Sequence, residues 1–326
     1  MKGITEQEAR SRDAVLAKLK NQPLELNLFH DKLVASGKSY LTVTKYIDDL
    51  IAFELFITGG TIEEDFYKGV TPADIERYME ATKTRRNNQG KIVDVSDETR
   101  ATKWSAINAF FQFLKERGRI EENPAEKTER PKQKRHQTVS YLTKEEIVKI
   151  MQRIRSDADD KFVNRDLCVF SLAVTAGLRL REISMINTDD VDFKTNTITI
   201  YKRGSKERTV SFGNNLKRYL QMWVKDRMFY FSDANTDALF VSQKKERLSI
   251  YRIRGIIKEY AEAAIGKDIT PRDLRASCAV TVYEETKNLS LVADIADVVP
   301  TSAARYAQAA DDKEKLAAVQ FMDELL

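Results

Sequence analysis

Two arginines and a tyrosine near the C-terminal end of the sequence could together bind and attack a phosphate. Pro271 suits the first position of a helix, and Arg272 and Arg275 then leave neighbouring positions on one face of that helix. Two guanidinium groups on one face form a fork for an oxyanion, best of all a phosphate. Tyr306, further along the chain, could supply a phenolic nucleophile. A basic helix followed by an ordinary half-buried tyrosine would explain the same residues without any chemistry.

Length and composition indicate a soluble protein with two domains. The chain has 326 residues, of which 32% are charged, and its mean hydropathy is −0.47. No apolar run approaches the ~20 residues that span a bilayer, and the first residues lack the apolar core of a signal peptide. The net charge of +4 is compatible with nucleic-acid binding but does not by itself indicate it.

The sequence offers little for metal or redox chemistry. Cys168 and Cys278 both lie in apolar helical patterns, which favours two small buried residues in a reducing cytoplasm over a disulfide or a metal pair. His30 and His136 are the only histidines, so a zinc site is not expected. We expect no metal and no cofactor.

The first part of the chain predicts a bundle of helices with almost no strand. Residues 1–19 predict a short helical N-terminal arm, and residues 20–126 a helical domain. Thr71, followed by a proline, is a strong helix start, and Ser96 caps a further helix. Residues 82–97 are polar and basic and contain a glycine, which predicts a loop.

Residues 127–139 combine prolines with dense positive charge and predict an extended basic linker. A strap across a phosphate backbone would explain why the charges share one sign, whereas simple solvation of a linker would explain their polarity; both interpretations stay open. Under the first, the residues that contact DNA are Lys127, Arg130, Lys132, Lys134 and Arg135.

Residues 140–310 predict a second domain that is helical apart from one hairpin. Thr143 opens a helix with a capping box, and a nearly continuous apolar helix ends at Gly177. Arg179 follows in a tightly packed corner, where an unpaired guanidinium is costly unless it serves a site. Residues 192–212 contain the convincing β pattern, two alternating strands around a turn.

Residues 311–326 predict a C-terminal tail helix. Its apolar face must dock on this chain or on a second copy, because such a face is not stable in water. The residues of that face are Leu316, Val319, Phe321, Met322, Leu325 and Leu326.

Four separate signals occur in a fixed order along the chain. They are Ala176-Gly177-Leu178-Arg179 with Glu182, Arg203-Gly204-Ser205-Lys206-Glu207-Arg208, Thr270-Pro271-Arg272-Asp273-Leu274-Arg275, and Tyr306. As a set they resemble the catalytic domain of tyrosine recombinases, the phage-integrase and Xer-like family. The helical first domain resembles the core-binding domain of that family, and residues 123–125 with 142–146 look like its interdomain signature.

The resemblance implies a mainly α fold with a small antiparallel β-sheet, in two domains that form a C-shaped clamp on double-stranded DNA. It implies a tyrosine that attacks a phosphodiester and forms a 3′-phosphotyrosyl link without metal or nucleotide cofactor. It also implies a prokaryotic, nucleoid-associated protein of the cytoplasm. Self-association on DNA through the tail helix follows from the same resemblance, with no membrane partner.

Carried over by position, Arg179 and Arg275 are the arginines that clamp the phosphate, and Tyr306 is the nucleophile. Guanidinium groups against the nonbridging oxygens stabilise the negative charge that accumulates there in the transition state. The departing 5′-hydroxyl group also needs a proton donor.

Three other positions depart from the family's pattern. The family's hairpin lysine aligns with Arg203, whose guanidinium binds phosphate but is a poor general acid. The first histidine aligns with Arg272, which keeps the charge but loses proton transfer near neutral pH. The second histidine or tryptophan aligns with Asp297, which repels a phosphate when ionised and cannot donate a hydrogen bond.

Two compensations and one complication stay open. Lys202 could replace the hairpin lysine only if the hairpin slips or twists, because neighbouring strand residues point to opposite faces. Lys206 lies across the turn and is another substitute; both lysines are also candidate DNA contacts. Asp297 could instead pair with Arg272 or Arg275 and sequester a phosphate-binding group.

The residues therefore predict a DNA-binding protein in which phosphate binding survives and proton transfer is damaged. We expect strand cleavage to be impaired or absent. The alternative is an active site-specific recombinase with an altered active site. The DNA sequence that it would recognise is not predictable from these residues.

Overall fold

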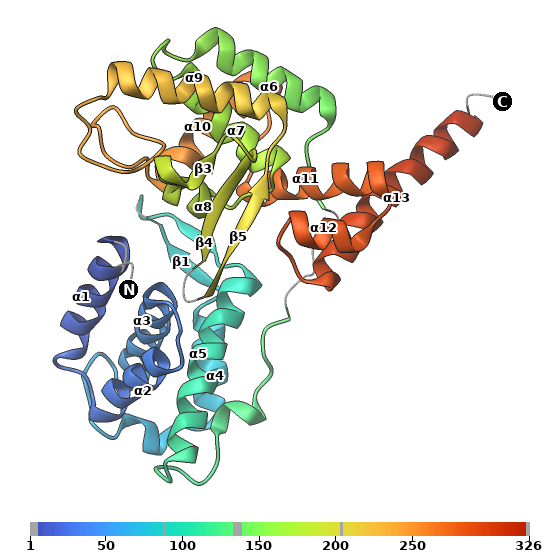
Figure 1. Cartoon of the computed structure of the whole chain (residues 1–326). Helices are drawn as coiled ribbons and strands as arrows, with labels where there is room; N and C mark the ends of the chain where they lie inside the picture. The colour runs from blue at the N-terminus through green and yellow to red at the C-terminus, as the bar shows by residue number, and fades with distance from the viewer. Residues whose placement is uncertain (1–5, 88, 133–138, 203–204, 324–326) are drawn as a thin grey trace. The chain divides into compact units, whose positions relative to one another are not determined.

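Helices make up most of the chain, and a few short antiparallel strands complete it (Figure 1). The computed structural model describes residues 6–87, 89–132, 139–202 and 205–323, and it describes the side chains of these ranges except at 6–10, 202, 205–207 and 313–323. The prediction of a mainly α chain with a small antiparallel β-sheet is confirmed. Two units can be separated, Met1–Arg135 and His136–Leu326. No helix in the described part of the chain is both long and apolar enough to cross a membrane.

Unit 1 is built around an aromatic core. Phe29, Phe53, Phe110 and Phe111 are almost completely buried, and their rings meet mainly edge to face. This geometry places the positive ring edge on the negative face of the next ring and adds to the gain from apolar burial. The elements around this core are α1 (Glu6–Leu19), α2 (Leu24–Ala35), α3 (Tyr40–Ile57), η1 (Phe66–Gly69), α4 (Pro72–Ala81), α5 (Asp97–Glu116) and η2 (Pro124–Lys127).

Local capping signals start the helices of unit 1. The side chains of Ser39, Thr71 and Ser96 each accept the backbone N–H three residues later, at the first turns of α3, α4 and α5. The two starts predicted at Thr71 and Ser96 are therefore confirmed. Residues expected as an N-terminal arm form α1, which packs against α3 and buries Val15 and Leu19 in the same core.

Residues 82–97, expected as a loop, contain a two-stranded antiparallel ribbon, so that prediction is wrong. β1 (Thr84–Arg86) pairs with β2 (Ile92–Asp94). Asn87 closes the connection by accepting two later backbone N–H groups on its Oδ1, and Gly90 adopts φ +78°. The side chains of both strands are largely exposed and mostly polar, so the ribbon lacks the alternating apolar pattern from which a strand is predicted.

Unit 2 is organised around α7 (Val163–Thr175), which is buried along almost its whole length. Helices pack against it on several sides, and this explains why its sequence shows an apolar run without a polar face. Trp223, fully buried, donates its indole N–H to the carbonyl of Leu239 at 2.8 Å. The covering helices are α6 (Lys144–Asp157), α9 (Asn214–Tyr230), α10 (Ile250–Ile265) and α11 (Pro271–Thr286).

A three-stranded antiparallel sheet with the order β3-β4-β5 lies in unit 2. The strands are β3 (Val191–Asp192), β4 (Thr197–Lys202) and β5 (Ser205–Ser211), after the short helices α8 (Leu180–Met185) and η3 (Thr188–Asp190). Ile200 lies opposite Arg208, and the register then shifts between Ile200 and Lys202. The β region predicted at residues 192–212 is confirmed.

A second, smaller core joins α11 to the last two helices, α12 (Leu289–Ile295) and α13 (Pro300–Asp323), in the orange and red part of Figure 1. It consists mainly of alanine and valine side chains, which let the helices approach closely, and Tyr306 belongs to it. Thr270 caps α11 with a capping box, and Pro271 is its first residue, as predicted. This core brings the turn between α12 and α13 next to the start of α8.

Candidate active site

Gly177 makes the corner that presents Arg179. Its φ of +58° is a left-handed conformation that suits glycine, and an added Cβ would lie 3.3 Å from Cys278 Sγ and 3.5 Å from Ala296 Cα. The end of α7 therefore passes close to both α11 and the end of α12. Arg179 follows as the residue that precedes α8.

Arg179 is held by two carboxylates from different elements. Its backbone N–H donates to Glu182 Oε2 at 2.7 Å and its Nη1 to Glu182 Oε1 at 3.1 Å. The same Nη1 donates to the carboxylate of Asp297, and Nη2 donates to the Asp297 carbonyl oxygen at 3.1 Å. The Arg179 side chain is still 47% exposed, so part of the guanidinium faces outward.

Arg275, on α11, donates to three backbone carbonyls, one at the corner after α7 and two in the turn between α12 and α13. Nη1 reaches the carbonyl of Gly177 at 3.0 Å, and Nη2 reaches those of Ala296 and Asp297, the latter at 3.2 Å. The Asp297 carbonyl thus accepts from Arg179 and Arg275 together. Two guanidinium groups that are distant in sequence converge on one peptide group.

The two arginines have pKa values that are shifted in opposite directions. Burial, and then the positive charge of Arg179, lower the pKa of Arg275 from its ordinary value. Burial also lowers the pKa of Arg179, but the hydrogen bonds to Asp297 and Glu182 more than offset this and raise it above its ordinary value. The local field around the pair is therefore the sum of two guanidinium charges and of the carboxylates of Glu182 and Asp297 that face them.

Tyr306 of α13 lies at the edge of this field. It is 9% exposed and packs in the small core of α11, α12 and α13. Its hydroxyl has no hydrogen-bond partner among the described residues. The hydroxyl oxygen is also not among the fully buried polar atoms without a partner, so solvent can reach it. A negative charge on Tyr306 would oppose the lowering of the Arg275 pKa, so the phenol lies within electrostatic reach of that guanidinium.

Arg272 shares α11 with Arg275 but has different surroundings. Its side chain is exposed, and it makes no hydrogen bond or ion pair with any described residue. The two guanidinium groups that come together are therefore those of Arg179 and Arg275. The fork of Arg272 and Arg275 that we expected on α11 is not formed. The reason is that α11 turns its Arg275 side toward the α12–α13 turn, whereas Arg272 faces solvent.

Asp297 does not pair its carboxylate with Arg272 or Arg275, the two partners that we considered. The carboxylate binds Arg179, and only the backbone carbonyl of Asp297 contacts Arg275. Asp297 has a φ of +46°, an uncommon conformation for a residue other than glycine. This turn aims both the carbonyl and the carboxylate at the arginines.

Two site residues were not predicted, although both lie inside the motifs quoted above. Glu182 is 8% exposed and bridges Arg179 to Arg208, whose Nη2 donates to Glu182 Oε2 at 3.2 Å. Arg208 lies on β5, its side chain is 17% exposed, and its Nε is buried without a partner. The signal that could have identified them is charge: burying a glutamate next to a phosphate-binding arginine requires a further cation.

The other predicted residues are only partly described. Arg203 lies outside the described residues, as do Lys134 and Arg135 of the linker, and the side chains of Lys202 and Lys206 are outside the description as well. In the linker, Lys127 pairs with Glu122, and Arg130 and Lys132 are exposed. For Lys202 to replace Arg203, the strand pairing of the hairpin would have to slip near this residue. The register of β4 and β5 does shift between Ile200 and Lys202.

The cluster of arginines can bind an anion beside a phenol. No group of three or more His, Cys, Asp or Glu side chains in the described part of the chain is placed to hold a metal ion. Burial raises the pKa of the Cys278 thiol to about 11, so this cysteine next to Gly177 is not a thiolate nucleophile.

Comparisons with known proteins give matches to two family models and to several named proteins. Residues 140–312, more than half of the chain, match the model of the phage integrase family, and residues 26–118 match that of the N-terminal SAM-like domain of phage integrases. The tyrosine recombinase XerC of Vibrio vulnificus is 31% identical over 196 residues, which is 60% of this chain and 60% of that protein. The match thus spans less than two thirds of this relative.

Solved structures share the fold at lower identity. The XerH site-specific recombinase bound to its palindromic difH substrate is 18% identical, with a TM-score of 0.71 over 97% of this chain and 90% of that one. A lambda integrase tetramer bound to a Holliday junction is 16% identical, with a TM-score of 0.64 over 95% of this chain and 88% of that one. These likenesses show a common architecture.

Proposed function

We propose that this chain, which belongs to the phage integrase family of tyrosine recombinases, binds double-stranded DNA and cleaves it feebly or not at all. The observation that carries the proposal is the ion pair between Arg179 and Asp297. A carboxylate of the chain itself occupies a guanidinium that, by the family resemblance, would clamp the scissile phosphate. Phosphate binding must therefore compete with an internal anion.

DNA binding is supported by the distribution of positive charge. Arg272 is exposed and has no partner among the residues that the structure describes, and Arg179 is half exposed although it is paired. In the linker, Arg130 and Lys132 are exposed and make no ion pair with any described residue. Cations without internal partners can release counterions from a phosphate backbone at little cost. The recombinases with the same fold are bound to DNA in their structures.

Impaired cleavage follows from the balance of the reaction. In the family's step the tyrosine hydroxyl loses its proton as its oxygen bonds to phosphorus, the bond from phosphorus to the 5′-oxygen breaks, and that oxygen takes up a proton. Arg272 and Arg203 hold their protons too tightly to donate one near neutral pH. Asp297 is engaged as a carboxylate with Arg179 and has no proton to give.

One observation favours the alternative of an active recombinase with an altered site. The hydroxyl of Tyr306 has no internal hydrogen-bond partner in the described part of the chain, and Arg275 lies within its electrostatic reach. Such a hydroxyl beside a guanidinium is placed to attack a phosphate that the guanidinium binds. Lys202 or Lys206 would then have to provide the missing proton.

A covalent-adduct assay tests both candidates. Selection from random duplexes first provides a DNA sequence that the protein binds, and a nicked duplex with that sequence then traps any covalent product. We expect a salt-sensitive complex and little or no adduct. An adduct at rates usual for recombinases, lost in Tyr306→Phe, would contradict impaired cleavage and support the alternative. Selection that enriches no DNA and a complex insensitive to salt would contradict DNA binding itself.

Restoring the family's proton donors sharpens the assay. The triple variant Arg203→Lys, Arg272→His, Asp297→His should raise adduct formation, because it supplies two imidazoles and an amine of suitable pKa. Tyr306→Phe in the same background is the matched control and should abolish the gain. If the triple variant forms no more adduct than the parent, the substitutions are not the cause of the defect.

We extend the proposal to self-association through the C-terminal tail. The backbone of α13 continues as helix to Asp323, and the sequence of residues 313–326 provides the apolar face described above. The lambda integrase of the same fold is a tetramer on its junction DNA. Truncation after Asp312 should reduce the number of copies that assemble on DNA, measured by light scattering of the complex. An unchanged mass of the complex would contradict a role of the tail.

A further inference from the structure

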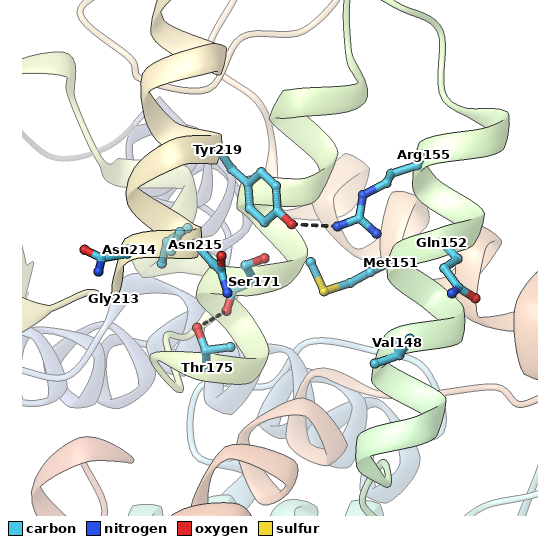
Figure 2. A pocket seen from close by; sticks show the side chains of 11 residues that line it. Val148, Met151, Gln152, Arg155, Ser171, Thr175, Gly213, Asn214, Asn215 and Tyr219 are labelled. Carbon is cyan, nitrogen blue, oxygen red and sulfur yellow. Dashed lines mark hydrogen bonds between the residues drawn. The ribbon is translucent and has the colours of Figure 1, made fainter.

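A cavity in unit 2 lies between α6, α7 and the start of α9, and the proposed function does not use it (Figure 2). Its volume is about 530 Å³, within the range of roughly 300–1,000 Å³ typical of small-molecule sites. No aspartate or glutamate is among its lining residues. In a chain rich in carboxylates, such a lining is suited to an anion.

Arg155 of α6 points across this cavity without a carboxylate of its own. Its Nη2 donates to the hydroxyl oxygen of Tyr219 at 2.6 Å, as Figure 2 shows, and the guanidinium lies 5.8 Å from the centre of that ring. Among the described residues it makes no ion pair. Arg153 on the same helix is different, because it pairs with Asp157 at 2.5 Å.

The hydroxyl groups of Ser171 and Tyr219 at the cavity each carry a proton that is not donated in a hydrogen bond to any described residue. Ser171 is 4% exposed and Tyr219 is 7% exposed, so both side chains are more than nine-tenths buried. The Tyr219 oxygen accepts from Arg155, but neither hydroxyl donates to any described residue. Both residues line the cavity. Ser171 Oγ is not among the polar atoms that are fully buried without a partner, so it is reachable from the cavity, and a bound acceptor could take a hydrogen bond from it.

The first turn of α9 adds backbone donors at the same place. Gly213 is its N-cap and has no side chain to cap the helix. The first backbone bond of the helix runs from the Lys217 N–H to the Gly213 carbonyl at 3.0 Å, which leaves the N–H groups of the three residues between them without a described partner. The start of a helix attracts negative charge through these donors and its dipole.

We propose that this cavity binds a small monocarboxylate with an apolar body. The carboxylate would accept from Arg155, from the hydroxyl groups of Ser171 and Tyr219, and from the start of α9. The apolar part would lie against Met151, Leu216 and Val148, the last of which is 52% exposed at the rim. One guanidinium among neutral donors matches a single negative charge better than the two charges of a phosphate.

Calorimetric titration of the whole chain with octanoate tests the site. Acetate has the carboxylate without the apolar body, octanol has the body without the carboxylate, and inorganic phosphate has charge without the body. We expect octanoate to bind at least about tenfold more tightly than each of these, since charge-assisted hydrogen bonds and apolar burial both contribute. Equal binding of octanoate and octanol would overturn the proposal. The titration uses no DNA, so its outcome is independent of the proposed function.

Variants assign the binding to the cavity. Arg155→Gln should weaken octanoate binding about tenfold, and Ser171→Ala and Tyr219→Phe each about threefold. Arg153→Gln removes the same charge from the same helix and should leave the affinity unchanged, and thermal unfolding confirms that each variant folds. If Arg153→Gln weakens binding as much as Arg155→Gln, the effect is one of general charge and the proposal fails. It fails equally if octanoate does not bind and Val148→Asp instead dissociates a complex of two chains, because the cavity is then a contact between copies.

Discussion

Each unit buries a glutamate between two arginines, and the two clusters have different consequences. In unit 1, Glu25 is 3% exposed and accepts from Arg119 Nε at 2.5 Å, with Arg117 Nε at 3.3 Å. In unit 2, Glu182 is bridged in the same way by Arg179 and Arg208. The local pattern of charges is therefore shared.

The two clusters differ in the other groups that their arginines contact. Arg117 lies over the ring of Phe113, and both arginines of Glu25 are about half exposed, so this cluster joins the end of α5 to α2 and stops there. Arg179 continues from Glu182 to Asp297, whose carbonyl it shares with Arg275. The cluster of unit 2 thus connects three elements, α8, α11 and the turn before α13, whereas the cluster of unit 1 connects two.

The largest expected effect distinguishes the two glutamates by stability. Glu182→Gln should lower the free energy of unfolding of unit 2 by about 3 kcal/mol, because Arg208 is 17% exposed and loses its counter-ion. Glu25→Gln should cost unit 1 clearly less, since water reaches both of its arginines. Urea unfolding measures this, with Trp223 as the fluorescent reporter in a Trp104→Phe background and Trp104 in a Trp223→Phe background. Equal losses would mean that the two clusters are equivalent.

Glu54 of α3 is a buried carboxylate that forms no ion pair with any described residue, and its pKa is shifted as a result. Burial raises its pKa to about 7, and one carboxylate oxygen has no partner. Because the folded state keeps this proton to higher pH than the unfolded state, the stability of unit 1 should fall as pH rises from about 4.5 through about 7. We expect a loss on the order of 1–3 kcal/mol, since each unit of pKa shift corresponds to about 1.4 kcal/mol.

Glu54→Gln should abolish that pH dependence and leave unit 1 at least as stable as the parent at about pH 8, measured by urea unfolding across the pH range. Asp49→Asn is the control, because Asp49 is buried between Lys45 and Lys103 and already has its cations. A pH dependence that survives Glu54→Gln would locate its origin elsewhere.

The ion pair of Asp297 is the next feature to test. Asp297→Asn should tighten binding to duplex DNA about threefold to tenfold, because the guanidinium of Arg179 loses one of its two internal anions and keeps only Glu182. Fluorescence anisotropy at constant salt measures this. Asp294→Asn, which removes the same charge from an exposed position one turn earlier, should have less effect. If both variants tighten binding equally, net charge and not the ion pair limits binding.

The smallest effect concerns Arg272, the exposed arginine of α11. Arg272→Gln should weaken DNA binding about twofold to threefold and reduce the slope of log affinity against log salt by about one phosphate contact. Arg252→Gln, at an exposed position paired with Glu259, is the matched control and should leave the slope unchanged. An unaltered slope for Arg272→Gln would place this arginine away from the DNA backbone.

Much of this protein is predictable from its residues alone. Thr71, Ser96, Thr143 and Thr270 each announce a helix start, because a cap is a hydrogen bond between residues three apart and needs no tertiary context. The order of the arginine motifs and the tyrosine identified the family. The ribbon of β1 and β2 was missed, because a backbone ladder with exposed polar side chains leaves no periodic trace.

Only the tertiary structure decided how the charges are shared. Arg179 and Asp297 lie 118 positions apart, and which guanidinium the carboxylate reaches depends on the left-handed turn at Asp297 and on the small core that docks α12 beside α8. The link from Glu182 to Arg208 depends likewise on the register of β5. Residue types determine which interactions are chemically available, but distances between segments remote in sequence are set by packing, and an ion pair exists only where packing brings its two charges together.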